Sequence, residues 1–155
     1  MNDNISSVLA ITIPAFNRAD VLRDNILMIL PEIREFSIPI YVSDDSTSNE
    51  TQNMLDEMQK TYENIFYFRN TPSLGHDRNI LHALNFPSTD YIWLLGDSLF
   101  LKRGAIKRVL EIIAEGQPEI IAVNSDYREL DRDCHYFDDC NEVFNTSAKK
   151  FQHIA

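Results

Sequence analysis

The chain has few cysteines and no long apolar run, and each shortage excludes a class of protein. Its 155 residues include two cysteines, Cys134 and Cys140, too few for a disulfide framework, so both are expected to be reduced thiols. No apolar stretch is longer than a strand, which excludes a transmembrane helix. The N-terminal residues lack a basic segment and a small-residue cleavage site, so no signal peptide is expected. These absences predict a cytoplasmic protein, in solution or at the inner face of the membrane.

Positive charge is also scarce. The 14 Lys and Arg residues face 24 Asp and Glu residues, which gives a formal net charge of −10 at pH 7. A nucleic-acid backbone would be repelled by such a chain, so nucleic acid is excluded as a partner. A polyphosphate ligand would need local help from a cation, an arginine or a helix N-terminus. Composition gives no indication of the oligomeric state.

Apolar runs alternate with amphipathic patterns along residues 1–125. Runs typical of buried strands stand at residues 8–14, 38–43, 64–70, 90–95 and 119–125. Apolar residues at helical spacing predict helices between them, at residues 19–33, 49–62, 73–84 and 104–115. The faces at this spacing carry Leu22, Ile26, Ile29 and Ile33 in the first helix, Leu55, Met58 and Tyr62 in the second, Asp77, Ile80, Leu81 and Leu84 in the third, and Ile106, Val109, Leu110 and Ile113 in the fourth. Pro31 is expected to close the first helix and Gly116 to cap the last. This order predicts an α/β domain with a mostly parallel sheet and flanking helices over residues 1–125.

Polar side chains follow three of the predicted strands: Asn17 and Arg18, then Asp44 and Asp45, then Asp97 and Ser98. The carboxyl ends of parallel strands share one edge of the sheet, which is where ligands bind in such folds. The acidic pair could instead start a turn and cap the next helix. No G-x-G-x-x-G or P-loop motif occurs, which disfavours a dinucleotide or P-loop site. The acids also follow the wrong strands for a phospho-acceptor receiver domain.

Four stretches resemble, in order and spacing, the nucleotide-sugar-binding half of family 2 glycosyltransferases: ITIPAFNRADVLRDNI, VSDDSTSNET, NTPSLGHDRNILHAL and DYIWLLGD. The resemblance covers roughly residues 8–124. It implies the Rossmann-like nucleotide-binding half of a GT-A fold. The polar residues 126–155 then form either a tail or the start of a truncated acceptor-binding region.

The resemblance also implies roles for individual residues. The loop after the first strand lines the nucleotide through Pro14, Ala15, Asn17 and Arg18. Asp45 accepts a hydrogen bond from the base, usually uracil, and Asp44 supports it. Arg78 faces the diphosphate, which its forked guanidinium suits. The alternative for Arg78 is a solvated position on a helix face.

A divalent cation, Mn²⁺ or Mg²⁺, is the cofactor that the resemblance implies, with Asp97 in the acidic metal motif. The sequence departs from the family here, because Ser98 stands where an aspartate is usual and Leu99 where another acid is frequent. A neutral hydroxyl is a poorer ligand for a hard cation than a carboxylate. Asp97 and Ser98 are therefore expected to hold the ion when the diphosphate supplies further oxygens. The alternative is that Asp97 accepts a hydrogen bond from the ribose or the sugar.

The implied function is transfer of a sugar from a nucleotide-diphosphate donor, expected to be a UDP-sugar, to a glycan or lipid-linked acceptor in polysaccharide biosynthesis. Inverting members of the family use an Asp or Glu as base. None of the acids of the tail is assigned this role: Asp126, Asp131, Asp133, Asp138, Asp139 and Glu142. The alternative is a non-catalytic nucleotide-binding fragment or degenerate relative, which Ser98 and the early stop at Ala155 suggest.

Overall fold

A computed structural model describes residues 8–123 of the chain, which divides into two units at Gly104 and Ala105. The described part of the first unit alternates strands and helices: β1 (Leu9–Ala15), α1 (Ala19–Glu35), β2 (Ile40–Asp44), α2 (Glu50–Gln59), β3 (Ile65–Arg69), α3 (His76–Ala83) and β4 (Tyr91–Leu94). The described part of the second unit contains α4 (Ala105–Gly116). Within residues 8–123, no helix combines the length and apolar character needed to cross a bilayer. The two cysteines and the polar residues 126–155 lie outside the described residues.

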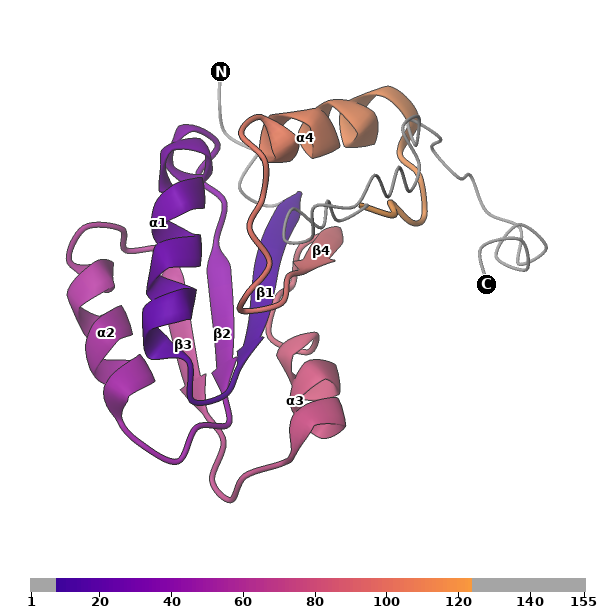
Figure 1. The fold of residues 1–155 in the computed structure, drawn as a ribbon. Helices are drawn as coiled ribbons and strands as arrows, with labels where there is room; N and C mark the ends of the chain where they lie inside the picture. The colour runs from indigo at the N-terminus through magenta and orange to yellow at the C-terminus, as the bar shows by residue number, and fades with distance from the viewer. Residues whose placement is uncertain (1–7, 124–155) are drawn as a thin grey trace, which may run out of the picture. The chain divides into compact units, whose positions relative to one another are not determined.

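The strands of the first unit form a four-stranded parallel sheet in the order β3-β2-β1-β4. The chain moves in one direction from β1 to β3 and then returns to the other side of β1. Right-handed crossovers therefore place α1 and α2 on one face of the sheet and α3 on the other (Figure 1). The strand order reverses beside β1, so its carboxyl end and that of β4 form a topological switch point. The predicted α/β fold with a parallel sheet is confirmed.

The face of the sheet under α1 and α2 carries the apolar core of this unit. The predicted apolar stripe of α1 is buried along its whole length, at Leu22, Ile26, Ile29 and Ile33. Helix α2 buries Leu55 and Met58 of its predicted stripe against the same face. Tyr62, the third residue of that stripe, is also buried but lies after the end of the helix at Gln59. The hydroxyl of Tyr62 donates to the main-chain oxygens of Ile33 and Ile38, at 3.0 and 2.7 Å. The helical spacing thus predicted which side chains are buried here, although the second helix ends at Gln59 and not at residue 62 as predicted.

The opposite face of the sheet is anchored by polar groups. Thr12 of β1 donates from its hydroxyl to the main-chain oxygen of Ala83 in α3, at 2.8 Å. The buried residues of α3 are Asn79 and Ala83, whereas Leu81 is 65% exposed. The predicted apolar face of this helix was therefore wrong at Leu81, while its other apolar members, Ile80 and Leu84, are half-buried. Short polar and small side chains bring α3 close to the backbone of β1 and β2, and this leaves the larger apolar residue outside.

Proline at position 31 does not end its helix. Helix α1 continues through Pro31 to Glu35, so the predicted stop at Pro31 was wrong. Proline removes one main-chain hydrogen bond and normally destabilises a helix interior. Ile29 and Ile33 on either side of it are buried, and their packing on the sheet outweighs that loss.

Two predictions near the end of the described residues were also wrong. Residues 119–123 form no strand, although their composition is apolar; residues 124 and 125 lie outside the described part. A strand is defined by pairing with a neighbour, and the sheet of the first unit contains only β1 to β4 among the described residues. Gly116 is the last residue of α4 rather than its cap, and the left-handed conformation falls on Gln117, with φ of 42°.

Candidate functional site

Three predicted site segments meet at the carboxyl edge of the sheet, the lower edge in Figure 1. The main-chain N–H of Asp45 donates to the oxygen of Ala15 at 3.0 Å, and that of Asn70 donates to the oxygen of Asp44 at 2.9 Å. These bonds extend the sheet pairing just beyond β1, β2 and β3. The residues that follow these three strands are thereby held side by side at the carboxyl edge.

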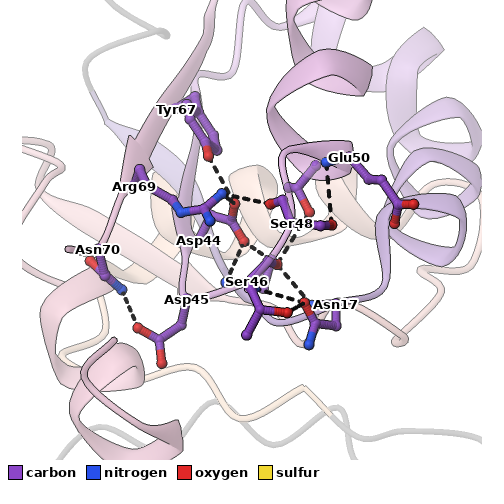
Figure 2. Close-up of polar contacts among 12 residues, drawn as sticks. Asn17, Asp44, Asp45, Ser46, Ser48, Glu50, Tyr67, Arg69 and Asn70 are labelled. Atoms are coloured by element: carbon purple, nitrogen blue, oxygen red, sulfur yellow. Dashed lines mark hydrogen bonds and ion pairs between the residues drawn. The ribbon is translucent and has the colours of Figure 1, made fainter. Parts of the chain in front are cut away.

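Asp44 lies fully buried at the end of β2, and protein groups engage both of its oxygens (Figure 2). Oδ2 accepts from the hydroxyl of Tyr67 at 2.8 Å and from Nη1 of Arg69 at 3.4 Å. Oδ1 accepts from the N–H of Ser46 at 3.0 Å and also from its hydroxyl. Arg69 donates in addition to the oxygen of Ser48 at 2.7 Å. Asp44 therefore organises the turn that leads from β2 into α2.

Asp45 is 3% exposed, and its carboxylate accepts four hydrogen bonds. Oδ1 accepts from Nδ2 of Asn70 at 3.1 Å and from the N–H of Leu74 at 2.7 Å. Oδ2 accepts from the hydroxyl of Ser73 at 2.6 Å and from the N–H of Gly75 at 2.9 Å. Asp45 thus holds the segment that enters α3, where Gly75 adopts a φ of 79° that suits glycine.

The electrostatics of Asp45 follow from these contacts. Burial alone raises the pKa of a carboxyl group. The hydrogen bonds from Ser73, Leu74, Gly75 and Asn70 together outweigh burial and hold the pKa of Asp45 below its ordinary value. Asp45 is therefore an anion at neutral pH, and its charge is matched by donors rather than by a cation.

A chain of buried amides connects Asp45 to α3. Nδ2 of Asn70 donates to Oδ1 of Asn79 at 2.9 Å as well as to Asp45. Nδ2 of Asn79 donates in turn to main-chain oxygens of β1 and β2, at 3.3 and 3.1 Å. Nδ1 of His82 lies 3.0 Å from Oδ1 of Asn70. The sequence analysis missed this network, although an asparagine inside an amphipathic helix is an unfavourable choice that could have signalled it.

The loop after β1 is joined to the loop after β2. The N–H of Asn17 donates to Oγ of Ser46 at 2.8 Å. Oδ1 of Asn17 accepts from the N–H and the hydroxyl of Thr47, at 2.9 and 3.2 Å. Figure 2 shows Asn17 directed at this turn. Pro14, which is half-buried, and Ala15, which is buried, end β1 at this edge of the sheet.

The remaining predicted site residues are more accessible. Nη1 of Arg18 lies 3.7 Å from Oδ1 of Asp97, with the side chains 58% and 16% exposed. Ser98, the next residue, is exposed. Arg78 is exposed on α3, and no hydrogen bond or ion pair is found for it with any residue between 8 and 123. The same residues contain no group of three or more His, Cys, Asp or Glu side chains that could hold a metal.

Known proteins share both the sequence pattern and the fold. The protein family described as Glycosyl transferase family 2 matches residues 10–150 of this chain. The chain is 28% identical over 115 residues to the abequosyltransferase RfbV of Salmonella typhimurium, across 73% of this chain and 34% of that protein. It is 29% identical over 114 residues to the GalNAc(5)-diNAcBac-PP-undecaprenol beta-1,3-glucosyltransferase of Campylobacter jejuni, across 72% and 36%. The solved mannosyltransferase PcManGT of Pyrobaculum calidifontis, in complex with GDP-Man and Mn²⁺, shares the fold with a TM-score of 0.58 and 15% identity, across 72% of this chain and 33% of that one.

The parallel sheet is the fold that this chain shares with the solved mannosyltransferase. The chain belongs to glycosyl transferase family 2, which confirms the family and the enzyme class that the four stretches predicted. It spans about a third of the length of the curated relatives, 34% and 36%. The acids considered as catalytic base, Asp126 to Glu142, lie outside the described residues.

Proposed function

We propose that this chain binds a nucleotide-diphosphate sugar, expected to be a UDP-sugar, at the carboxyl edge of the sheet, for transfer to a glycan or lipid-linked acceptor. The observation that carries the proposal is the meeting of loops from β1, β2 and β4 at one switch point, with Arg18 and Asp97 within reach of each other. The name of the Campylobacter relative includes a PP-undecaprenol-linked saccharide, which supports a lipid-linked acceptor. A cytoplasmic location at the inner face of the membrane would suit such an acceptor.

The base is proposed to bind at Asp45 by exchange with Ser73. Asp45 already accepts four hydrogen bonds, as many as two carboxylate oxygens ordinarily take. Ser73 is exposed, so its hydroxyl can turn to water when the ring N–H of a uracil replaces it. Such an exchange retains the main-chain bonds to Leu74 and Gly75. Asn17 and the loop with Pro14 and Ala15 would line the nucleotide beside it.

The diphosphate is proposed to contact Arg78. Arg78 lies in the first turn of α3, close to the segment that Asp45 holds, and its guanidinium is exposed. A guanidinium can donate two parallel hydrogen bonds to phosphate oxygens. Arg18 offers a second positive charge at the same edge. With a net charge of −10, the chain would depend on these two cations to attract an anionic donor.

A divalent cation fits this edge when the donor is bound. Mn²⁺ and Mg²⁺ are often held by one or two carboxylates together with phosphate oxygens and water. Asp97 offers one carboxylate that remains partly accessible, and Ser98 offers a hydroxyl beside it. The ion would neutralise charge that develops on the departing diphosphate. The mannosyltransferase of similar fold was solved with Mn²⁺, which supports this choice.

Calorimetric titration of the full chain with UDP and with GDP, each with Mn²⁺ and with EDTA, tests the proposal. We expect UDP to bind more tightly than GDP, and Mn²⁺ to strengthen binding. Arg78→Ala should weaken UDP binding at least about fivefold, the effect of losing a charge-assisted contact worth about 1 kcal/mol or more. Lys60→Ala is the control, because Lys60 follows α2 near the opposite edge and pairs with Glu57. No binding of either nucleotide would refute the donor site.

A non-catalytic nucleotide-binding module is the second candidate, favoured by the neutral Ser98 next to Asp97. Donor hydrolysis and transfer assays separate the two candidates. Turnover of a UDP-sugar supports the transferase, whereas binding without turnover supports the module.

A further inference from the structure

A side chain of α1 holds the turn that carries Asp97. The N–H of Leu95 still donates to the oxygen of Thr12 at 3.0 Å, and after it the chain leaves the sheet. Nδ2 of Asn25 then donates to the main-chain oxygens of Gly96 and Asp97, at 3.3 and 3.2 Å, across 71 and 72 positions of sequence. One amide group therefore fixes two successive peptides of this turn.

Asn25 is a poor choice for stability alone. It is fully buried in the interior of α1, on the same face as Leu22, Ile26 and Ile29. Its Oδ1 has no hydrogen-bond partner among residues 8–123. A buried amide oxygen without a partner is destabilising, and asparagine is an unfavourable residue in a helix. A leucine of similar size would stabilise this position at least as well, so the contribution of Asn25 is to the geometry of the turn.

The turn itself is tight enough to transmit this constraint. The N–H of Leu99 donates to the oxygen of Gly96 at 3.1 Å. A Cβ added at Gly96 would meet the side chain of Leu99 at 3.2 Å. The oxygen of Gly96 thus keeps a donor when Asn25 is replaced, while the oxygen of Asp97 loses the amide. Replacement should loosen the peptide of Asp97 and leave the helix intact.

We infer that Asn25 is a positioning residue that orients the carboxylate of Asp97 toward a diphosphate-bound divalent cation. This inference rests on the proposed donor site. Ser98 is neutral, so Asp97 supplies the one carboxylate at the turn and its direction decides whether the ion is held. The ion pair with Arg18 spans 3.7 Å and the Arg18 side chain is 58% exposed, which makes this pair a weak constraint. The two hydrogen bonds from the buried side chain of Asn25 constrain the turn more firmly.

Asn25→Leu in the full chain tests the inference through UDP titrations with Mn²⁺ and with EDTA. Partners that orient metal ligands typically contribute 10- to 100-fold to metal affinity. We expect the gain in UDP affinity from Mn²⁺ to fall about tenfold, and binding in EDTA to change by a smaller factor. The urea midpoint of Asn25→Leu should not fall below that of the wild-type chain. A purely structural role of Asn25 would require such a fall. Asn53→Leu, the same change at an exposed position of α2, should alter none of these quantities.

A double mutant shows whether Asn25 acts through Asp97. In an Asp97→Ala background, Asn25→Leu should cause no further loss of the Mn²⁺ gain, because coupled residues are not additive. Three results would overturn the inference and leave the donor site standing. They are an additive loss in the double mutant, an undiminished Mn²⁺ gain in Asn25→Leu, and a wild-type chain that binds UDP without any Mn²⁺ gain. A wild-type chain that binds no UDP would overturn the donor site itself. If Asn25→Leu does not fold, Asn25→Ala must show the same loss of Mn²⁺ gain.

Discussion

Replacement of Asp45 by asparagine should destabilise the chain in a pH-dependent way. Each Asp45 oxygen accepts one main-chain N–H, from Leu74 on Oδ1 and from Gly75 on Oδ2. Asparagine has one oxygen, so either orientation of its amide sets an NH₂ group against a main-chain N–H. Asp45→Asn therefore removes a charge and leaves a buried donor without an acceptor, while side-chain volume hardly changes.

The magnitude follows from these contacts. A buried donor that loses its acceptor costs about 1–3 kcal/mol, and hydrogen bonds to a charged group are worth more than neutral ones. We expect Asp45→Asn to lower the free energy of unfolding by about 3 kcal/mol at pH 7. Domains of this size have about 5–15 kcal/mol of stability, so the variant should still fold.

The pH dependence has a definite sign. The pKa of Asp45 is lowered in the folded chain, so its stabilisation is present above the unfolded pKa of about 3.9 and is lost as pH falls through the folded pKa. Urea unfolding followed by circular dichroism at pH 7, 5 and 3.5 measures this difference. The gap between wild type and Asp45→Asn should be constant from pH 7 to 5 and narrow below 4. The exposed Asp56→Asn on α2 is the control. A gap below about 1 kcal/mol at pH 7, or one independent of pH, would refute this view of Asp45.

Two further predictions concern the neighbouring groups. Ser98→Asp should strengthen UDP binding in Mn²⁺ but not in EDTA, because a second carboxylate joins Asp97. Equal UDP affinities of Ser98→Asp and the wild-type chain in calorimetry with Mn²⁺, or the same gain from Ser88→Asp ahead of β4, would contradict this. Tyr67→Phe should lower the free energy of unfolding by about 1–2 kcal/mol, because buried Asp44 loses a donor at 2.8 Å. Burial, reinforced by Asp44 and opposed by Arg69, raises the pKa of Tyr67. Its hydroxyl therefore stays protonated, and the urea-unfolding difference should be constant from pH 6 to 9; a pH-dependent difference would contradict the assignment.

Periodicity and strand composition predicted most of the fold. The spacing of Leu22, Ile26, Ile29 and Ile33 identified the buried face of α1, because burial against a sheet imposes that repeat. The polar residues after β1, β2 and β4 were correctly expected at one edge, because parallel strands share their carboxyl ends. The absence of the predicted strand at residues 119–123 could not be foreseen from composition, because a strand also requires a neighbour with which to pair.

The contacts within the site were less predictable. Asp44 and Asp45 look alike in sequence, yet one meets Tyr67 and Arg69 and the other meets Ser73 and main-chain N–H groups. Main-chain donors have no signature in the sequence, so the hydrogen bonds that the carboxylate of Asp45 accepts from Leu74 and Gly75 could not be foreseen. Asn25 was equally hidden, since its two acceptors are main-chain oxygens more than 70 positions away.

Amide hydrogen exchange of the full chain, with and without UDP and Mn²⁺, tests the central claim most directly. Binding at the carboxyl edge should slow exchange in residues 16–18, 73–78 and 97–99, and leave residues 59–64 at the opposite edge unchanged. Protection of the opposite edge, or binding without protection of any of those three segments, would contradict the placement of the nucleotide.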